Sequence, residues 1–246
     1  MSSRVGLQLY TVHVECEDNF RGVLKKAAEL GYQSVEFTGY YGLTAEELKK
    51  ELDTLGLKPV SSQKMIPDIA ENLDEVVAYA KAIGLENIAS CVGDVSSKEA
   101  MLDTIEQIRP LVHRMTEEGM YFLYHNHGPE FALIDGERPI DVLLRTFEGE
   151  NFGLELDTYW AAEYGADICA FMKENADKIK NIHVKGGDGK GHSCPFERSV
   201  LDVREIVSCA LSLGIPDILV EDDTPDPDGM TVAILNSKTL KEWKAF

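Results

Sequence analysis

The stretch Glu117-Glu-Gly-Met-Tyr-Phe-Leu-Tyr-His-Asn-His127 contains a helix end, an apolar strand and a polar strand end in one short segment. Gly119 suits the left-handed conformation that ends many helices, because it has no Cβ atom to clash with the backbone. The aromatic and aliphatic run that follows is typical of a buried strand. The segment therefore predicts a helix–strand junction whose strand ends at His125, a side chain that binds metal ions.

The same junction recurs along the chain, with a glycine shortly before an apolar run at Gly31, Gly56, Gly84 and Gly214. Eight strands are expected, near residues 5–10, 33–38, 58–62, 87–92, 120–125, 152–157, 179–184 and 217–221. Each is followed by a helical pattern, the last over about 231–244. This alternation predicts one (β/α)₈ TIM barrel over residues 1–246, since such barrels take about 250 residues. A doubly wound sheet is the alternative, but no Gly-rich phosphate loop follows the first strand.

Composition narrows the class of protein. The formal net charge is -19 over 246 residues, which disfavours a nucleic-acid partner because phosphate binding depends on basic surface. The five cysteines form no CxxC pair, as is usual in a reducing compartment. No apolar run approaches the roughly 18 residues of a membrane helix, and the start does not resemble a signal peptide. We therefore expect a cytoplasmic protein with no membrane partner.

Four of the expected strands end in side chains that commonly bind metals, namely His125, Asp157, His183 and Glu221. Taken singly, Asp157 before Thr158 is more often a helix cap or turn residue, and His183 is more often a core histidine. Their common position favours a shared site, because a TIM barrel builds its active site at the C-terminal strand ends. Two imidazoles and two carboxylates suit one divalent ion, with Mn²⁺ first and Zn²⁺, Co²⁺ or Fe²⁺ as alternatives.

Other candidates lie close to these strand ends. His127 and Glu130 follow the fifth strand and are candidate proton-transfer groups, as is Glu221. Lys185 lies two residues beyond His183, where a cation could stabilise a developing enolate or bind a phosphate; a solvated loop lysine is the alternative.

Three residues are candidates for binding the substrate. Glu36 ends the second expected strand and could accept a hydrogen bond, whereas Trp160 and Tyr10 are aromatic side chains suited to the apolar face of a sugar.

Several segments resemble signatures of one family, the sugar phosphate isomerase/epimerase group of xylose-isomerase-like TIM barrels. They are Gly6-Leu-Gln-Leu-Tyr-Thr-Val12, Val35-Glu-Phe-Thr-Gly-Tyr-Tyr-Gly42, Tyr124-His-Asn-His-Gly-Pro-Glu-Phe131, Glu155-Leu-Asp-Thr-Tyr-Trp160 and His183-Val-Lys185. The resemblance spans nearly the whole chain in order. It implies a metal at the barrel mouth and relatives that isomerise, epimerise or dehydrate sugars and inositols through an enediolate-type intermediate.

Carried over by position, the resemblance implies that Asp157, His183 and Glu221 are metal ligands. His125 stands where many epimerases have a glutamate that is both ligand and base, and Trp160 stands where several have a histidine. The segment Glu197-Arg-Ser199 also differs from the Gly-Glu-Gly of many relatives.

Three hypotheses on function follow. The first is a metal-dependent isomerase or epimerase acting on a sugar, keto-sugar or cyclitol. The main alternative is a metal-dependent lyase or dehydratase acting on a keto-sugar, an inosose or a 3-keto-glycoside. A non-catalytic sugar-binding subunit is the third. The resemblance also allows a homodimer. Endonucleases of the wider superfamily need a multi-zinc site with more ligands than the predicted cluster offers.

Overall fold

The computed structural model describes residues 3–91 and 93–245. Within these residues, eight parallel strands close into a barrel in the order β1-β10-β7-β6-β5-β4-β3-β2. The barrel strands are β1 (Arg4–Gln8), β2 (Ser34–Phe37), β3 (Lys58–Met65), β4 (Asn87–Cys91), β5 (Tyr121–His125), β6 (Phe152–Asp157), β7 (Ile179–Val184) and β10 (Asp217–Val220). The predicted TIM barrel is thus confirmed.

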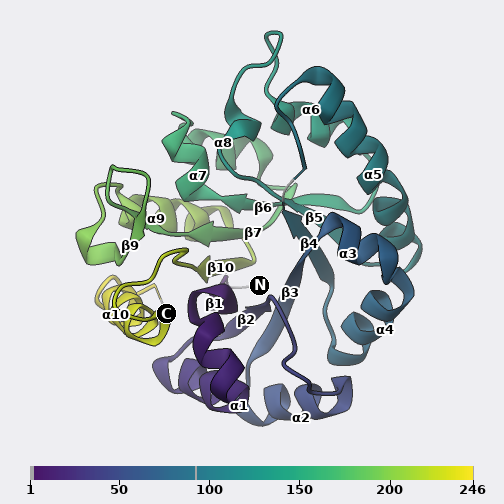
Figure 1. Ribbon diagram of the computed structural model, residues 1–246. Coiled ribbons are helices and arrows are strands. Elements are labelled where there is room, and N and C mark those ends of the chain that lie inside the picture. Colours follow the sequence, from purple (N-terminus) through teal and green to yellow (C-terminus); the bar gives the residue numbers. More distant parts are fainter. Residues whose placement is uncertain (1–2, 92, 246) are drawn as a thin grey trace.

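Helices surround the barrel on its outside, with the last helix beside the first (Figure 1). They are α1 (His13–Leu30), α2 (Ala45–Leu55), α3 (Ile66–Glu71), α4 (Leu73–Ile83), α5 (Lys98–Glu117), α6 (Pro139–Thr146), α7 (Thr158–Glu163), α8 (Ile168–Asn175), α9 (Val203–Leu213) and α10 (Gly229–Glu242). Short 3₁₀ turns are η1 (Leu9–Val12), η2 (Pro129–Phe131) and η3 (Phe196–Arg198), and a small hairpin pairs β8 (Gly186–Gly187) with β9 (Ser193–Cys194).

The glycines that predicted the helix ends act as expected. Gly31, Gly56, Gly84 and Gly214 all adopt the left-handed conformation directly after a helix. The backbone N–H of each then bonds back to a carbonyl of the last turn, which satisfies groups that the helix end leaves open. These four junctions lie directly before β2, β3, β4 and β10.

Strand ends differ from the predictions by up to three residues, the largest difference being β3, which was expected over 58–62 and runs to Met65. The first strand was expected over 5–10 but ends at Gln8, whose side-chain Oε1 accepts a hydrogen bond from Tyr10 N at 3.0 Å and starts a 3₁₀ turn. The fourth was expected over 87–92; it is described to Cys91, and residue 92 lies outside the described residues. None of the helices described here combines the length and apolar composition that a membrane crossing requires.

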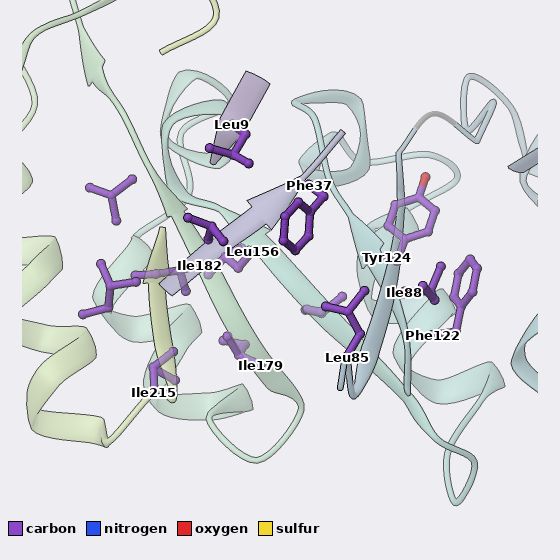
Figure 2. Packing of buried hydrophobic residues seen from close by; sticks show 14 of the residues in the cluster. Leu9, Phe37, Leu85, Ile88, Phe122, Tyr124, Leu156, Ile179, Ile182 and Ile215 are labelled. Atoms are coloured by element: carbon purple, nitrogen blue, oxygen red, sulfur yellow. The ribbon is translucent and has the colours of Figure 1, made fainter. Parts of the chain in front are cut away.

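Apolar side chains face the helices, and many polar ones face the barrel interior. Successive residues of a strand point to opposite faces, so Leu154 and Leu156 belong to the core packed under the helices while Glu155 and Asp157 point inward. Figure 2 shows part of this core, with Ile88, Phe122 and Tyr124 labelled. The barrel interior near the C-terminal strand ends therefore holds buried charged groups, which must form ion pairs or hydrogen bonds with one another.

Candidate metal centre and active site

Ligand atoms of strands five, six and seven meet inside the barrel mouth. Among the described residues, His125, Asp157 and His183 offer three ligand atoms within 4.8 Å of one another, and all three are buried. The ends of β5, β6 and β7 bring them together because these strands are hydrogen-bonded neighbours in register, with Asp157 paired to His183. The predicted convergence of these residues is therefore observed.

Glu221 reaches the same place from the end of β10. Its Oε2 lies 2.6 Å from His183 Nδ1, and it borders the same open cavity as His125. Burial raises the pKa of Glu221, but Lys185 and His183 outweigh burial and hold that pKa well below its usual range. The carboxylate is ionised and able to bind a cation.

The surroundings of the Asp157 carboxylate show whether a cation fits among these ligand atoms. Its Oδ2 is buried, and the Lys185 Nζ lies 2.8 Å away from it in an ion pair. Its Oδ1 accepts the backbone N–H of Trp160 at 3.0 Å, which caps α7 and fixes the carboxylate. A buried carboxylate needs a cationic partner, which either an ammonium or a metal ion can supply. Together with two imidazoles it suits a borderline divalent ion.

His183 is oriented from both sides. Nδ1 contacts Glu221 at 2.6 Å, and Nε2 contacts Glu36 Oε2 at 2.6 Å. Burial alone would lower the pKa of His183, but Glu221, Glu155 and Glu36 together raise it well above its usual value. A carboxylate on one ring nitrogen commonly fixes the orientation of a metal-binding histidine, which leaves the other nitrogen for the ion.

Glu36 and Glu155 form a carboxylate pair below the strand ends. Ser61 Oγ donates to Glu36 at 2.8 Å, and Asn181 Nδ2 donates to Glu155 at 2.9 Å. Burial, and then the charge of Glu36, raises the pKa of Glu155 to about 7. With His183, the two glutamates make a second group of ligand atoms within 4.8 Å, but neither lines the open cavity described next.

A cavity of about 310 Å³ opens above this centre. It is lined by Tyr10, Gln63, Cys91, His125, His127, Trp160, Lys185, Glu221 and Asp223. Burial lowers the pKa of His127, so its imidazole is neutral near neutral pH and can accept a proton. The predicted residues His127, Trp160 and Tyr10 thus lie around the mouth together with the ligand set.

Lys185 is buried in the wall of this cavity. Its Nζ lies 2.8 Å from Asp157 Oδ2, 2.9 Å from Glu221 Oε2 and 2.8 Å from Asp223. Burial alone would lower the pKa of Lys185, but these three carboxylates raise it well above its usual value. The alternative of a solvated loop lysine does not hold.

Two candidate residues lie elsewhere than expected. Glu130 is buried outside the cavity lining; one oxygen accepts the Tyr124 hydroxyl at 2.9 Å and the other the His127 backbone N–H at 3.0 Å. It therefore holds the His127 loop in place. Glu36 was expected to contact substrate, but it is fully buried against His183 and Ser61. The reason is depth, since Glu36 lies one residue inside the end of β2.

Sequence inspection missed several participants. Glu155 and Asn181 each precede a predicted ligand by two residues on the same strand, so the strand period already placed them on the inward face. Ser61 and Asp223 gave no comparable signal, because their roles depend on contacts with other strands.

The raised pKa of Glu155 makes stability depend on pH. Folding favours the protonated acid, so the contribution is complete below the unfolded pKa of about 4.5 and is lost as pH rises through about 7. Across that window the loss is about 3 kcal/mol, at about 1.4 kcal/mol for each pKa unit. In EDTA, Glu155→Gln should remove most of this pH dependence in urea unfolding at pH 5 and pH 8.

The exposed Glu148→Gln variant is the matched control and should keep the wild-type pH dependence. If the free energy of unfolding changes equally between pH 5 and pH 8 in the wild type and in Glu155→Gln, the raised pKa of Glu155 is contradicted.

Comparisons with known proteins agree with this geometry. Residues 24–235 match the family model described as xylose isomerase-like TIM barrel. Hydroxypyruvate isomerase from Escherichia coli (strain K12) is 26% identical over 200 residues, covering 71% of this chain and 77% of that protein.

Two solved structures share the fold. A sugar phosphate isomerase/epimerase from Parabacteroides distasonis superposes with a TM-score of 0.83 at 21% identity, covering 98% of each chain. A structure described as the IOLI protein with a binding zinc atom has a TM-score of 0.75 at 13% identity, covering 99% of each chain. At these identities the structures show the fold alone, whereas the family model spans most of the chain. The chain therefore belongs to the xylose isomerase-like TIM barrel family, whose members are mostly metal-dependent sugar isomerases and epimerases.

Proposed function

We propose that this protein is a divalent-metal-dependent isomerase or epimerase acting on a sugar, keto-sugar or cyclitol through an enediolate-type intermediate. The observation that carries the proposal is the open cavity of about 310 Å³ directly above His125, Asp157, His183 and Glu221. The buried Oδ2 of Asp157, which lies 2.8 Å from the Lys185 ammonium, supports a cation-binding role for this carboxylate. Mn²⁺ is the first ion to test, with Zn²⁺, Co²⁺ and Fe²⁺ as alternatives.

Asp157, His183 and Glu221 would hold the ion, with His125 as the fourth ligand. When bound, a divalent ion supplies Lewis acidity, which polarises a carbonyl and acidifies the adjacent C–H. Glu36 fixes the His183 ring from below through Nε2 at 2.6 Å. This contact leaves Nδ1, on the Glu221 side, as the nitrogen available for the ion.

His127 and Glu221 are the two groups placed to move the proton. His127 follows β5 and Glu221 follows β10, and these strands are separated by β6 and β7 around the barrel. A substrate in the cavity would therefore meet the neutral imidazole and the ionised carboxylate from different directions. Return of the proton to the neighbouring carbon gives isomerisation, and return to the opposite face gives epimerisation. Glu130 supports His127 by accepting its backbone N–H.

The charges of the cavity wall favour a substrate without a phosphate group. Glu221 and Asp223 are acidic, and the Lys185 ammonium is already shared among three carboxylates. Trp160 and Tyr10 provide apolar surface on which the carbon face of a sugar can pack. An uncharged polyol with an α-hydroxycarbonyl group matches both features.

The test is turnover of a substrate panel by Mn²⁺-loaded protein in deuterated water. Ketohexoses and inososes form the main panel; 3-keto-glycosides test the lyase alternative, and hydroxypyruvate is included because the curated relative is named for it. We expect an isomeric product that carries solvent deuterium at the carbon next to the carbonyl.

Two outcomes would contradict the proposal. A dehydrated or cleaved product would assign the site to a lyase. No turnover, together with less than a tenth of an equivalent of bound metal, would favour a non-catalytic sugar-binding protein, because four converging ligands should retain the ion.

A further inference from the structure

Lys185 is a buried lysine that lies beside the candidate metal ligands. Its side chain is almost completely buried, with 2% exposure, and lysine is rarely buried unless it is paired. It follows His183 by two residues and lies directly after the end of β7, and its Nζ and the His183 ring both contact Glu221. The ammonium therefore lies among the residues that would hold the ion.

Two of its partners are metal-ligand candidates. Nζ lies 2.8 Å from Asp157 Oδ2 and 2.9 Å from Glu221 Oε2, and this second oxygen also contacts His183 Nδ1. Lys185 thus bridges carboxylates from β6 and β10. A divalent ion bound between Asp157 and Glu221 would draw on the same two carboxylates as Lys185.

The third partner is of a different kind. Asp223 accepts from Nζ with both carboxylate oxygens at 2.8 Å, and its side chain is 26% exposed. Asp223 follows β10 in the loop that borders the cavity, and it belongs to neither group of converging ligand atoms. The ammonium therefore keeps a partner when Asp157 and Glu221 are engaged elsewhere.

We propose that Lys185 is the resident counter-ion of the metal-free site: it competes with a divalent ion for Asp157 and Glu221, and Asp223 retains it when the ion binds. This inference rests on the proposed metal-dependent function and adds a determinant of metal affinity. It also leaves Lys185 beside the bound substrate with one carboxylate partner in place of three. A cation released in this way can stabilise negative charge on a substrate oxygen.

The test measures Mn²⁺ binding directly, from the electron paramagnetic resonance signal of free Mn²⁺ at one fixed pH. Lys185→Met should bind Mn²⁺ about tenfold more tightly, because the competitor is gone. Asp223→Asn should bind it about tenfold more weakly, because Lys185 then has only the ligand carboxylates as partners; outer-sphere changes typically alter metal affinity by about 10- to 100-fold.

The double variant separates this coupling from a simple loss of negative charge. If Asp223 acts through Lys185, Asp223→Asn should change affinity much less in the Lys185→Met background. An equal effect in both backgrounds would overturn the inference. Lys190→Met, an exposed lysine of the following loop, removes the same charge and should leave the Mn²⁺ affinity unchanged.

A second readout needs no metal. In EDTA, Lys185→Met should melt at least about 5 °C below the wild type, since three carboxylates lose their cation, and Mn²⁺ should restore more stability to the variant than to the wild type. If that variant does not fold, Lys185→Gln replaces it. If Lys185→Met or Lys185→Gln binds Mn²⁺ as the wild type does, or more weakly, the inference is overturned and the proposed function is not. A wild type that takes up no Mn²⁺ overturns both the inference and the proposed function, whereas a metal-binding wild type that turns over nothing overturns only the function.

Discussion

His183→Asn should abolish stable metal binding and reduce turnover at least about a thousandfold, corresponding to about 4 kcal/mol of lost transition-state stabilisation. The reason lies in the two ring nitrogens. Nδ1 reaches Glu221 and Nε2 reaches Glu36, so one imidazole joins the upper ligand set to the buried carboxylate pair. The shorter amide offers one donor and one acceptor group on a single carbon and cannot span both contacts.

Metal content of the purified, Mn²⁺-loaded variant is the primary measurement, followed by turnover with any substrate found in the panel. His113→Asn, on an exposed part of α5, is the control and should match the wild type in both. Circular dichroism shows whether the barrel remains folded. A His183→Asn protein with a full equivalent of metal and normal turnover would rule out the proposed centre.

The Glu36→Gln variant distinguishes the loss of a metal ligand from the loss of the carboxylate that orients the His183 ring. Glutamine retains the shape of Glu36 and an acceptor oxygen, but it removes the charge facing Nε2. We expect metal affinity to fall by about 10- to 100-fold while some binding remains. Loss as complete as that of His183→Asn would instead make Glu36 a ligand, as the second group of converging atoms would allow.

Phe37→Ala should lower the free energy of unfolding by about 4 kcal/mol, within the range measured for buried phenylalanines. Phe37 is the residue after Glu36, has no exposed surface and packs in the apolar layer shown in Figure 2, with its ring centroid 5.7 Å from that of Tyr40. Alanine would leave a cavity between β2 and the helices. Urea unfolding in EDTA measures the change without a contribution from metal binding.

Phe37→Leu retains most of the apolar volume and should cost much less, and the folded Phe37→Ala protein should bind Mn²⁺ as the wild type does. The physical reason is the alternation of β2, which directs Phe37 to the helices and Glu36 to His183. A cost below about 1 kcal/mol would mean that the layer collapses around the missing ring.

Much of the architecture was predictable because its causes are local. A glycine ends a helix through its own backbone freedom, and Gly31, Gly56, Gly84 and Gly214 mark helix ends in the structure as they do in the sequence. The first strand shows the limit of such prediction, since its end depends on Gln8 bonding to Tyr10 N. The hydrogen bond from Tyr10 N to Gln8 starts a 3₁₀ turn in place of further β1 pairing, and no sequence pattern predicts it.

For the site, the sequence predicted which side chains lie near strand ends. It did not predict how deep in the barrel each of them lies. Glu36 and Glu221 both lie near the end of a strand, yet Glu36 is a buried support for His183 and Glu221 borders the cavity. Glu36 lies within β2, beside a register shift between Val35 and Glu36, whereas Glu221 lies just past the end of β10. Register depends on pairing with neighbouring strands, which one segment does not contain.

The sequence by itself determined the barrel, the alternation of apolar and polar faces, and the placement of His125, Asp157, His183 and Glu221 at or next to the ends of four strands. Only the tertiary structure decided that Lys185 bridges Asp157, Glu221 and Asp223. Helix ends and strand faces follow from interactions over a few residues. The contacts of Lys185 with Asp157 at the end of β6 and with Glu221 after β10 exist only once the barrel closes and brings strands distant in sequence to one mouth.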